Sequence, residues 1–421
     1  MATAATSSNM ANSVATTPNV VSIWPYDGTL QFGALVASGW APSPLNEFIF
    51  KVETRCNLSC DYCYVYNLGD ESWKNAPKFM DVEIARAAGS RIREHALHHD
   101  LSRVGVSLHG GEPLMRGWRP ITEFVTVMRE VLAPIEVEFS MQTNATLVTR
   151  SIAEELLRLG IRVGVSIDGD ELANRHRVDL RGRSSFAKTL KGIETLGEYE
   201  GLIQGALAVV NLESDPLAVY RAIEGLGFSS VDFLLPHGTW DARPPKKTAE
   251  RSIHALAPYA DWLIKIYEHW ANDDGRMQVR IFDDIVHLLL GGQFSYESLG
   301  LAPAQLAVIE ADGSIELVDH IGIAYSGAEV TGASVLNNSL DEVLQHPGVM
   351  SRQIGAAALV DECQACPMLK ICGGGLITHR WDSERGFRNT TVYCADMYAL
   401  ISHIRDDLVE RSRAPIASLA S

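Results

Sequence analysis

The stretch "RCNLSCDYCYVYN", residues 55–67, gathers Cys56, Cys60 and Cys63 within eight positions, and the next cysteine along the chain is Cys363. A tetrahedral structural zinc site needs four ligands, so three clustered cysteines leave either a ligand from elsewhere or an open coordination position. The stretch directly follows "EFIFKVE", an apolar run that predicts a strand. We therefore expect a metal centre at the end of the first strand.

The segment between residues 46 and 240 alternates short apolar runs with longer amphipathic patterns. The expected strands are 47–53, 103–110, 136–143, 161–168, 203–211 and 230–237. Helical patterns, with apolar residues every three or four positions, cover 81–99, 120–132 and 150–160. Repeated strand and helix units predict a parallel sheet with right-handed crossovers. Six units make an α/β fold, a partial (β/α)6 barrel of the TIM type.

The remaining segments divide the chain further. We expect a helix over 251–272, a hairpin that turns at Asp312-Gly313, and a closing helix over 397–413. Residues 1–45 lack the basic start and apolar core of a signal peptide and predict a partly disordered lead. The expected parts are a lead (1–45), a core barrel (46–245), bridging helices and hairpin (246–345), and a C-terminal module with the closing helix (346–421).

Composition limits the partners. The net charge of −16 argues against broad electrostatic binding to nucleic acid or to an anionic membrane. No window approaches the roughly 18 consecutive apolar residues of a membrane span. We expect a cytoplasmic protein whose seven cysteines serve as metal ligands rather than as a disulfide framework.

The other four cysteines form a second group near the C-terminus. "CQACPMLKICGGG" and the later "VYC" contain Cys363, Cys366, Cys372 and Cys394. Four thiolates suit a zinc ion or an iron-sulfur cluster, because both accept tetrahedral sulfur coordination. The spacing alone leaves both possibilities open.

The spacing of the first group resembles that of the radical S-adenosylmethionine (SAM) superfamily. This resemblance implies that Cys56, Cys60 and Cys63 hold a [4Fe-4S] cluster with one iron free for the amino and carboxylate groups of SAM. Tyr62 stands where the family carries an aromatic residue near the adenine, although it could simply be a packed loop tyrosine.

Polar residues at strand ends fit the same interpretation, since parallel barrels place their chemistry there. In "LHGGEP", Gly110 and Gly111 permit close backbone approach, and Glu112 can accept a hydrogen bond from the methionine ammonium group. For these residues an ordinary turn is the alternative.

The next two strand ends add further candidates for the SAM site, and ordinary surface polar contacts are the alternative for Ser166, Asp168 and Arg177. "MQTNAT" offers Thr143 and Asn144, and "GVSIDG" offers Ser166 and Asp168 toward ribose or carboxylate. Arg177 resembles an arginine that meets the SAM carboxylate in these enzymes.

The C-terminal group resembles the SPASM extension of peptide-modifying radical enzymes, which implies one auxiliary [4Fe-4S] cluster on its four cysteines; a zinc knuckle is the alternative. Val318 and Leu376 stand where a full SPASM module has cysteines for a second auxiliary cluster. Asp319 resembles the aspartate that accepts a proton in anaerobic sulfatase-maturing enzymes. The alternative is an aspartate on the surface at the end of a strand, with no part in catalysis.

A closer resemblance covers residues from about 42 to 405. It is to FxsB-type radical SAM/SPASM maturases and rests on "FIFKVETRCNLSCDYCYVYN", "SLHGGEPL", "RGRSSF", "VDFLLPHGTW", "DGSIELVD" and "CGGGLITHRWDSERGFRNTTVYCADM". Ala145, where a glycine is usual, and "DHIGIAYSG" depart from the pattern. The resemblance implies a ribosomal precursor peptide as substrate and an external electron donor of the flavodoxin or ferredoxin type.

The implied reaction forms a cyclophane crosslink. A 5′-deoxyadenosyl radical takes a β-hydrogen from the peptide, and the carbon radical attacks an aromatic ring two positions earlier. Loss of a proton and an electron then restores aromaticity, with Asp319 as base and the auxiliary cluster as electron acceptor. Thioether formation, epimerisation and formylglycine-type oxidation remain alternatives, the last disfavoured by the low cysteine count. A non-catalytic, metal-stabilised peptide-binding module is the alternative from another class.

Overall fold

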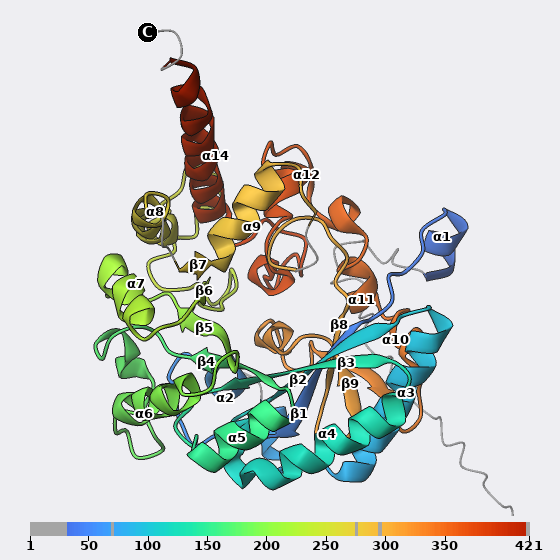
Figure 1. Ribbon diagram of the computed structural model, residues 1–421. Helices are drawn as coiled ribbons and strands as arrows, with labels where there is room; N and C mark the ends of the chain where they lie inside the picture. The colour runs from blue at the N-terminus through green and yellow to red at the C-terminus, as the bar shows by residue number, and fades with distance from the viewer. Residues whose placement is uncertain (1–31, 69–70, 274–276, 294–296, 418–421) are drawn as a thin grey trace, which may run out of the picture.

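The computed structural model describes residues 32–68, 71–273, 277–293 and 297–417 (Figure 1). Most of the predicted disordered lead, residues 1–31, lies outside this described part, and the first element is the short helix α1 (Phe32–Ala37). None of the described helices combines the length and apolar character that crossing a membrane requires.

In the described part of the chain, one ten-stranded sheet forms in the order β10-β9-β8-β1-β2-β3-β4-β5-β6-β7. Its strands are β1 (Glu47–Glu53), β2 (Arg103–Gly110), β3 (Glu136–Thr143), β4 (Arg162–Ser166), β5 (Ile203–Val209), β6 (Ser230–Leu234), β7 (Gln278–Val279), β8 (Leu306–Ile309), β9 (Ser314–Glu316) and β10 (Val330–Ser334). Strands β1 to β6 are parallel neighbours in sequence order. This confirms the expected α/β partial barrel.

Helices cover the outer side of the curved sheet (Figure 1). The longer ones are α3 (Val82–His98), α4 (Trp118–Leu132), α5 (Arg150–Arg158), α6 (Phe186–Gly197), α7 (Pro216–Gly225), α8 (Pro258–Trp270) and α9 (Arg280–Leu289). Their amphipathic faces close the core. For example, Phe50 of β1 packs edge-on against Phe124 of α4, with ring centroids 5.1 Å apart.

The sequence predicts a helix over 251–272, and this prediction is wrong for residues 251–257. Helix α8 begins at Pro258, and the preceding residues form turns. Proline suits the first turn of a helix, where its missing N–H is not needed, but its ring disfavours helical geometry at the residue before it. The apolar periodicity of 251–257 therefore does not become helix.

The hairpin forms as predicted, and it extends the barrel sheet. Strand β8 pairs parallel with β1 and antiparallel with β9. Gly313 in the turn has φ of +89°, in the left-handed region that favours glycine. The sheet edge thereby carries the hairpin, and the 3₁₀ helix η5 (Asp319–Ile323) that follows it, next to the start of the barrel.

The C-terminal part consists of short helices and one long helix. They are α10 (Leu340–Val343), α11 (Pro347–Ser351), α12 (Asp361–Gln364), α13 (Leu369–Cys372) and α14 (Cys394–Ala417). The other short elements are α2 (Tyr64–Asn67), η2 (Ser72–Lys74), η3 (Pro113–Arg116), η4 (Ala173–His176), η6 (Gly355–Ala358) and η7 (Ile377–Arg380). The predicted closing helix lies within α14, which packs against α8 and α9.

Candidate active site

A cavity of about 690 Å³ opens where the parallel strands end. All twelve residues that the sequence assigns to the SAM-binding cluster and to SAM line it: Cys56, Cys60, Tyr62, Cys63, Gly110, Gly111, Glu112, Thr143, Asn144, Ser166, Asp168 and Arg177. They come from five separate chain segments. The fold thus brings distant motifs to one place, as the carboxyl ends of parallel strands do.

The three cysteines occupy the loop between β1 and α2. Leu58 N–H donates to Cys56 Sγ at 3.4 Å, and Asn144 Nδ2 lies 3.8 Å from the same sulfur. Burial raises the pKa of Cys56 to about 12 and that of Cys60 to about 11. The neighbouring thiols also contribute to both raised pKa values, by a smaller amount. The thiolate is the form that binds metal, so these thiols need a strong positive charge to ionise. An iron-sulfur cluster supplies that charge, and the loop fits one.

Glu112 accepts three hydrogen bonds from within the protein. Its Oε1 accepts hydrogen bonds from Thr143 Oγ1 at 2.7 Å and Leu114 N–H at 3.1 Å, and its Oε2 accepts one from Asn144 N–H at 2.8 Å. The side chain is 1% exposed, and burial raises its pKa. Glu112 therefore joins the ends of β2 and β3, and a SAM ammonium group would add a fourth partner to a carboxylate that already has three.

Gly110 and Gly111 permit a close approach of the chain to itself. A Cβ on Gly110 would lie 1.8 Å from the carbonyl oxygen of Glu53, and one on Gly111 would lie 2.3 Å from the carbonyl carbon of Arg55. Gly110 also has φ of +141°. The two glycines let the β2 end lie directly against the start of the cysteine loop, and both also line the cavity.

Tyr62, Asp168 and Arg177 form a hydrogen-bonded chain on the cavity wall. The Tyr62 hydroxyl donates to Asp168 Oδ2 and accepts from Arg177 Nη1 at 2.9 Å. Arg177 Nε is buried without a partner among the described residues. A buried guanidinium N–H without an acceptor is costly, and a ligand carboxylate would satisfy it. The cavity therefore fits the carboxylate end of SAM at this position.

Asp168 and Ser166 make further contacts within the protein. Asp168 Oδ1 accepts from Val209 N–H at 3.0 Å, which fastens the β4 end to β5. Ser166 Oγ accepts from Gln142 Nε2 at 2.7 Å. These contacts hold the strand ends in register around the cavity.

Asp319 lies behind the large cavity rather than in its lining. It forms a buried ion pair with Lys51 of β1 and lines a smaller, water-sized cavity. Burial raises the pKa of Asp319, but Lys51 and His109 outweigh this and lower it overall. Burial also raises the pKa of Glu310 to about 7 and that of Glu316 to about 9 in this second cavity. Asp319 is thus an ionised carboxylate that lines the smaller cavity and not the large one.

The four C-terminal cysteines lie near one another, and the charge of Arg380 acts on Cys363 and Cys372. Cys363 and Cys366 lie at α12, Cys372 ends α13, and Cys394 begins α14. Burial raises the pKa of Cys372 to about 11 and that of Cys394 to about 12, and the neighbouring thiols contribute.

Arg380 is buried and donates to the carbonyl oxygens of Gly373, Gly374 and Gly375 at 2.6–3.3 Å. Its guanidinium is therefore held in place beside the thiols. Burial lowers its pKa, while Cys363 and Cys372 act in the opposite direction. The charge of Arg380 would offset part of the negative charge of thiolates, so the group fits a cysteine-bound metal centre.

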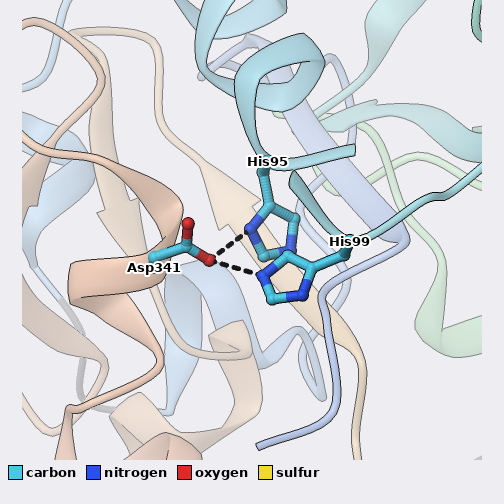
Figure 2. Close-up of side chains that lie close together, drawn as sticks. All are labelled: His95, His99 and Asp341. Atoms are coloured by element: carbon cyan, nitrogen blue, oxygen red, sulfur yellow. Dashed lines mark hydrogen bonds and ion pairs between the residues drawn. The ribbon is translucent and has the colours of Figure 1, made fainter. Parts of the chain in front are cut away.

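Two histidine clusters had no sequence signal in the motifs considered. One joins His237, which lines the large cavity, to His320 and His379, and it is discussed below. The other joins His95 and His99 to Asp341 (Figure 2). His95 Nε2 accepts from Leu45 N–H at 2.9 Å, which assigns the ring proton to Nδ1, and Nδ1 donates to Asp341 Oδ1 at 2.8 Å. His95 has no lone pair left for a metal, so this cluster ties α3 to α10 and to the chain before β1.

Comparison with known proteins agrees with this geometry. Residues 51–205 match the model of the radical SAM superfamily. The serine-type anaerobic sulfatase-maturating enzyme of Bacteroides thetaiotaomicron is 26% identical over 392 residues, 87% of this chain and 92% of that protein. The cysteine-type enzyme of Clostridium perfringens (strain 13 / Type A) is 25% identical over 365 residues, 83% of this chain and 94% of that protein.

Solved structures share the fold. Native anSMEcpe with bound AdoMet superposes with a TM-score of 0.75 at 22% identity, covering 88% of this chain and all of that one. Streptococcus suis SuiB superposes with a TM-score of 0.57 at 16% identity, covering 86% of this chain and 79% of that one.

Together, the barrel, the three-cysteine loop and the matched segment define an enzyme that uses SAM and an iron-sulfur cluster. Residues 51–205 are the part of the chain that matches the radical SAM superfamily. Its cofactors are a [4Fe-4S] cluster and SAM. The sequence predicts a more specific group, the FxsB-type maturases. These comparisons do not reach that level of detail, and the similar proteins that they identify include sulfatase-maturating enzymes.

Proposed function

We propose that this radical SAM enzyme modifies a ribosomally made precursor peptide and joins an aromatic ring carbon to the β-carbon of a residue two positions later. The cluster and SAM, when bound, supply the radical that removes the β-hydrogen. In this proposal Cys56, Cys60 and Cys63 hold the cluster. Tyr62 and Arg177 orient SAM at one wall of the cavity, and Glu112 fixes the strand ends that face it. An external donor of the flavodoxin or ferredoxin type supplies the first electron.

The distribution of cysteines carries this proposal. Cys363, Cys366, Cys372 and Cys394 account for one auxiliary cluster, and the position before Asp319 that would serve a second cluster holds Val318. Val318 is 4% exposed and packs in the hydrophobic core. An enzyme with a single auxiliary cluster can still accept the one electron that ring aromatisation releases.

Peptide conversion tests the reaction. The reconstituted and reduced enzyme is incubated with SAM and synthetic peptides in which an aromatic residue precedes varied residues by two positions. We expect one or more peptides to lose two hydrogens and to show, by fragmentation, no cleavage between the joined residues. An aldehyde that reacts with a hydrazide would instead identify formylglycine-type oxidation: a serine forms it by losing two hydrogens, and a cysteine forms it by losing two hydrogens and then exchanging its sulfur for the oxygen of water, with release of hydrogen sulfide.

Formylglycine-type oxidation is the second candidate function, because the sulfatase-maturating relatives align over more than four-fifths of this chain. A peptide with a sulfatase-type serine or cysteine is therefore included in the same experiment. The two reactions give different products from different peptides, so the hydrazide readout separates them.

Metal analysis tests the C-terminal site. We expect two [4Fe-4S] clusters, or about eight irons per chain. Among the described residues, only His95, His99 and Asp341 bring three ligand atoms of His, Cys, Asp or Glu within 4.8 Å of one another. Thiolates on a tetrahedral zinc, with Zn–S of about 2.3 Å, would lie closer together than that. Four irons and one zinc per chain would support the zinc knuckle instead.

A further inference from the structure

Three histidines lie next to one another beside the large cavity: His379 is buried, and His237 and His320 are partly buried. His237 follows β6 and lines this cavity, His320 lies in η5, and His379 lies in η7. The rings of His237 and His320 are stacked with centroids 5.2 Å apart, and the rings of His237 and His379 lie 5.6 Å apart. The ring of Tyr64, which directly follows Cys63, makes a T-shaped contact with the ring of His237, with centroids 4.9 Å apart. His237 thus connects the SAM side of the cavity with the C-terminal module.

The ring of His237 carries an unsatisfied nitrogen. Its Nδ1 is buried without a hydrogen-bond partner among the described residues, and so is His379 Nε2. Burial lowers the pKa of His237 to about 4, so the ring is neutral at pH 7. A buried polar atom without a partner is rare in a folded protein and calls for an explanation. A neutral imidazole facing a substrate cavity can accept a proton.

The charge of Asp319 favours the protonated form of His237. Asp319 is the residue before His320, whose ring stacks on His237, and its charge acts on His237 in the direction that raises the pKa of that ring. Its ion pair with Lys51 keeps Asp319 ionised. Because Asp319 lies outside the lining of the large cavity, a peptide in that cavity meets His237 first.

We propose that His237 is the catalytic residue that takes the proton from the crosslinked aromatic ring, with Asp319 as the countercharge behind it. This proposal rests on the proposed cyclophane reaction. In that reaction the β-carbon loses a hydrogen atom to the 5′-deoxyadenosyl group, and a C–C bond forms to the ring. The ring C–H bond then breaks, its proton passes to the neutral imidazole of His237, and one electron passes to the auxiliary [4Fe-4S] cluster as one-electron acceptor. The peptide thereby loses two hydrogens.

The test separates the two halves of this reaction. The probe is whichever aromatic-x-x peptide the wild-type enzyme crosslinks, deuterated at the reacting β-carbon. In His237→Gln we expect deuterium to enter 5′-deoxyadenosine at a rate within a few-fold of wild type. Crosslinked product should fall by about 10²- to 10⁴-fold, the usual contribution of a general base. Added imidazole should restore product in His237→Gly, where the side chain leaves a hole.

His346→Gln is the matched control, because His346 is also a mostly buried histidine with a pKa lowered to about 4, but it caps α11 away from the cavity. We expect it to keep both readouts. Normal crosslinking in His237→Gln would overturn the proposal, as would an equal loss of both readouts with no rescue of His237→Gly by imidazole. If the wild-type enzyme crosslinks none of the probe peptides, the proposed cyclophane function fails first, before any variant is compared.

Asp319→Asn distinguishes the two roles. As a countercharge, Asp319 should lower crosslinking less than His237 does, and imidazole should not restore it. A larger loss in Asp319→Asn than in His237→Gln, again with deuterium transfer intact, would overturn the assignment of His237 as the proton acceptor and return that role to Asp319.

Discussion

Replacing Cys60 by alanine should reduce formation of 5′-deoxyadenosine to background. In the proposed assignment Cys60 is one of only three protein ligands of the cluster that cleaves SAM, and its thiol lies partly buried in the lining of the cavity. Losing a ligand's supporting partner typically costs about 10- to 100-fold in metal affinity or activity, so losing the ligand itself should cost more. Chromatography of the reduced, reconstituted enzyme with SAM alone measures the effect.

Cys394→Ala is the matched control for Cys60→Ala. Cys394 is also a partly buried cysteine with a pKa raised mainly by burial, but it belongs to the C-terminal group. This variant should lose about half of the iron, as expected for two [4Fe-4S] clusters per chain, and should still cleave SAM. Turnover of SAM by Cys60→Ala at the wild-type rate would remove the three-cysteine loop from the radical site.

The barrel could be predicted because its strands are buried and regularly spaced. For β1, β2 and β3 the expected bounds coincide with the observed ones, since each is a run of apolar or alternating residues between clear helical patterns. Strand β7 has only two residues, Gln278 and Val279, and no periodicity can reveal so short a strand. Strand β10 contains Gly332 with φ of +77°, which interrupts the alternation.

The site divides in a similar way. Residues that belong to short motifs of neighbouring residues, such as the cysteines and Gly110, could be predicted from those motifs. Lys51 and Asp319 are separated by 268 positions, and His237, His320 and His379 come from three distant segments. Only the packing of the hairpin and the C-terminal module against the barrel brings them together. Sequence alone therefore identified Asp319 as a candidate base but could not place it behind His237.

Arg177→Met should weaken SAM binding by roughly 10- to 100-fold, from the about 1.5–3 kcal/mol of a hydrogen bond to a charged group. Arg177 is 7% exposed and lines the cavity, and its Nε has no acceptor among the described residues. Methionine keeps much of the length and apolar stem of the side chain but removes the charge that would meet the SAM carboxylate. Equilibrium dialysis of the reconstituted enzyme with labelled SAM measures the affinity.

Two controls distinguish a carboxylate contact from general disruption of the wall. Arg175 lies two residues earlier, at η4, but is partly exposed and paired with Glu213, so Arg175→Met should leave SAM affinity unchanged. Tyr62→Phe removes the hydroxyl that joins Arg177 to Asp168 and should cost less than Arg177→Met, because the guanidinium itself remains. If Arg177→Met bound SAM as tightly as Arg175→Met, the buried guanidinium would serve only to hold the loop of Tyr62. The SAM carboxylate would then need another cation on the cavity wall.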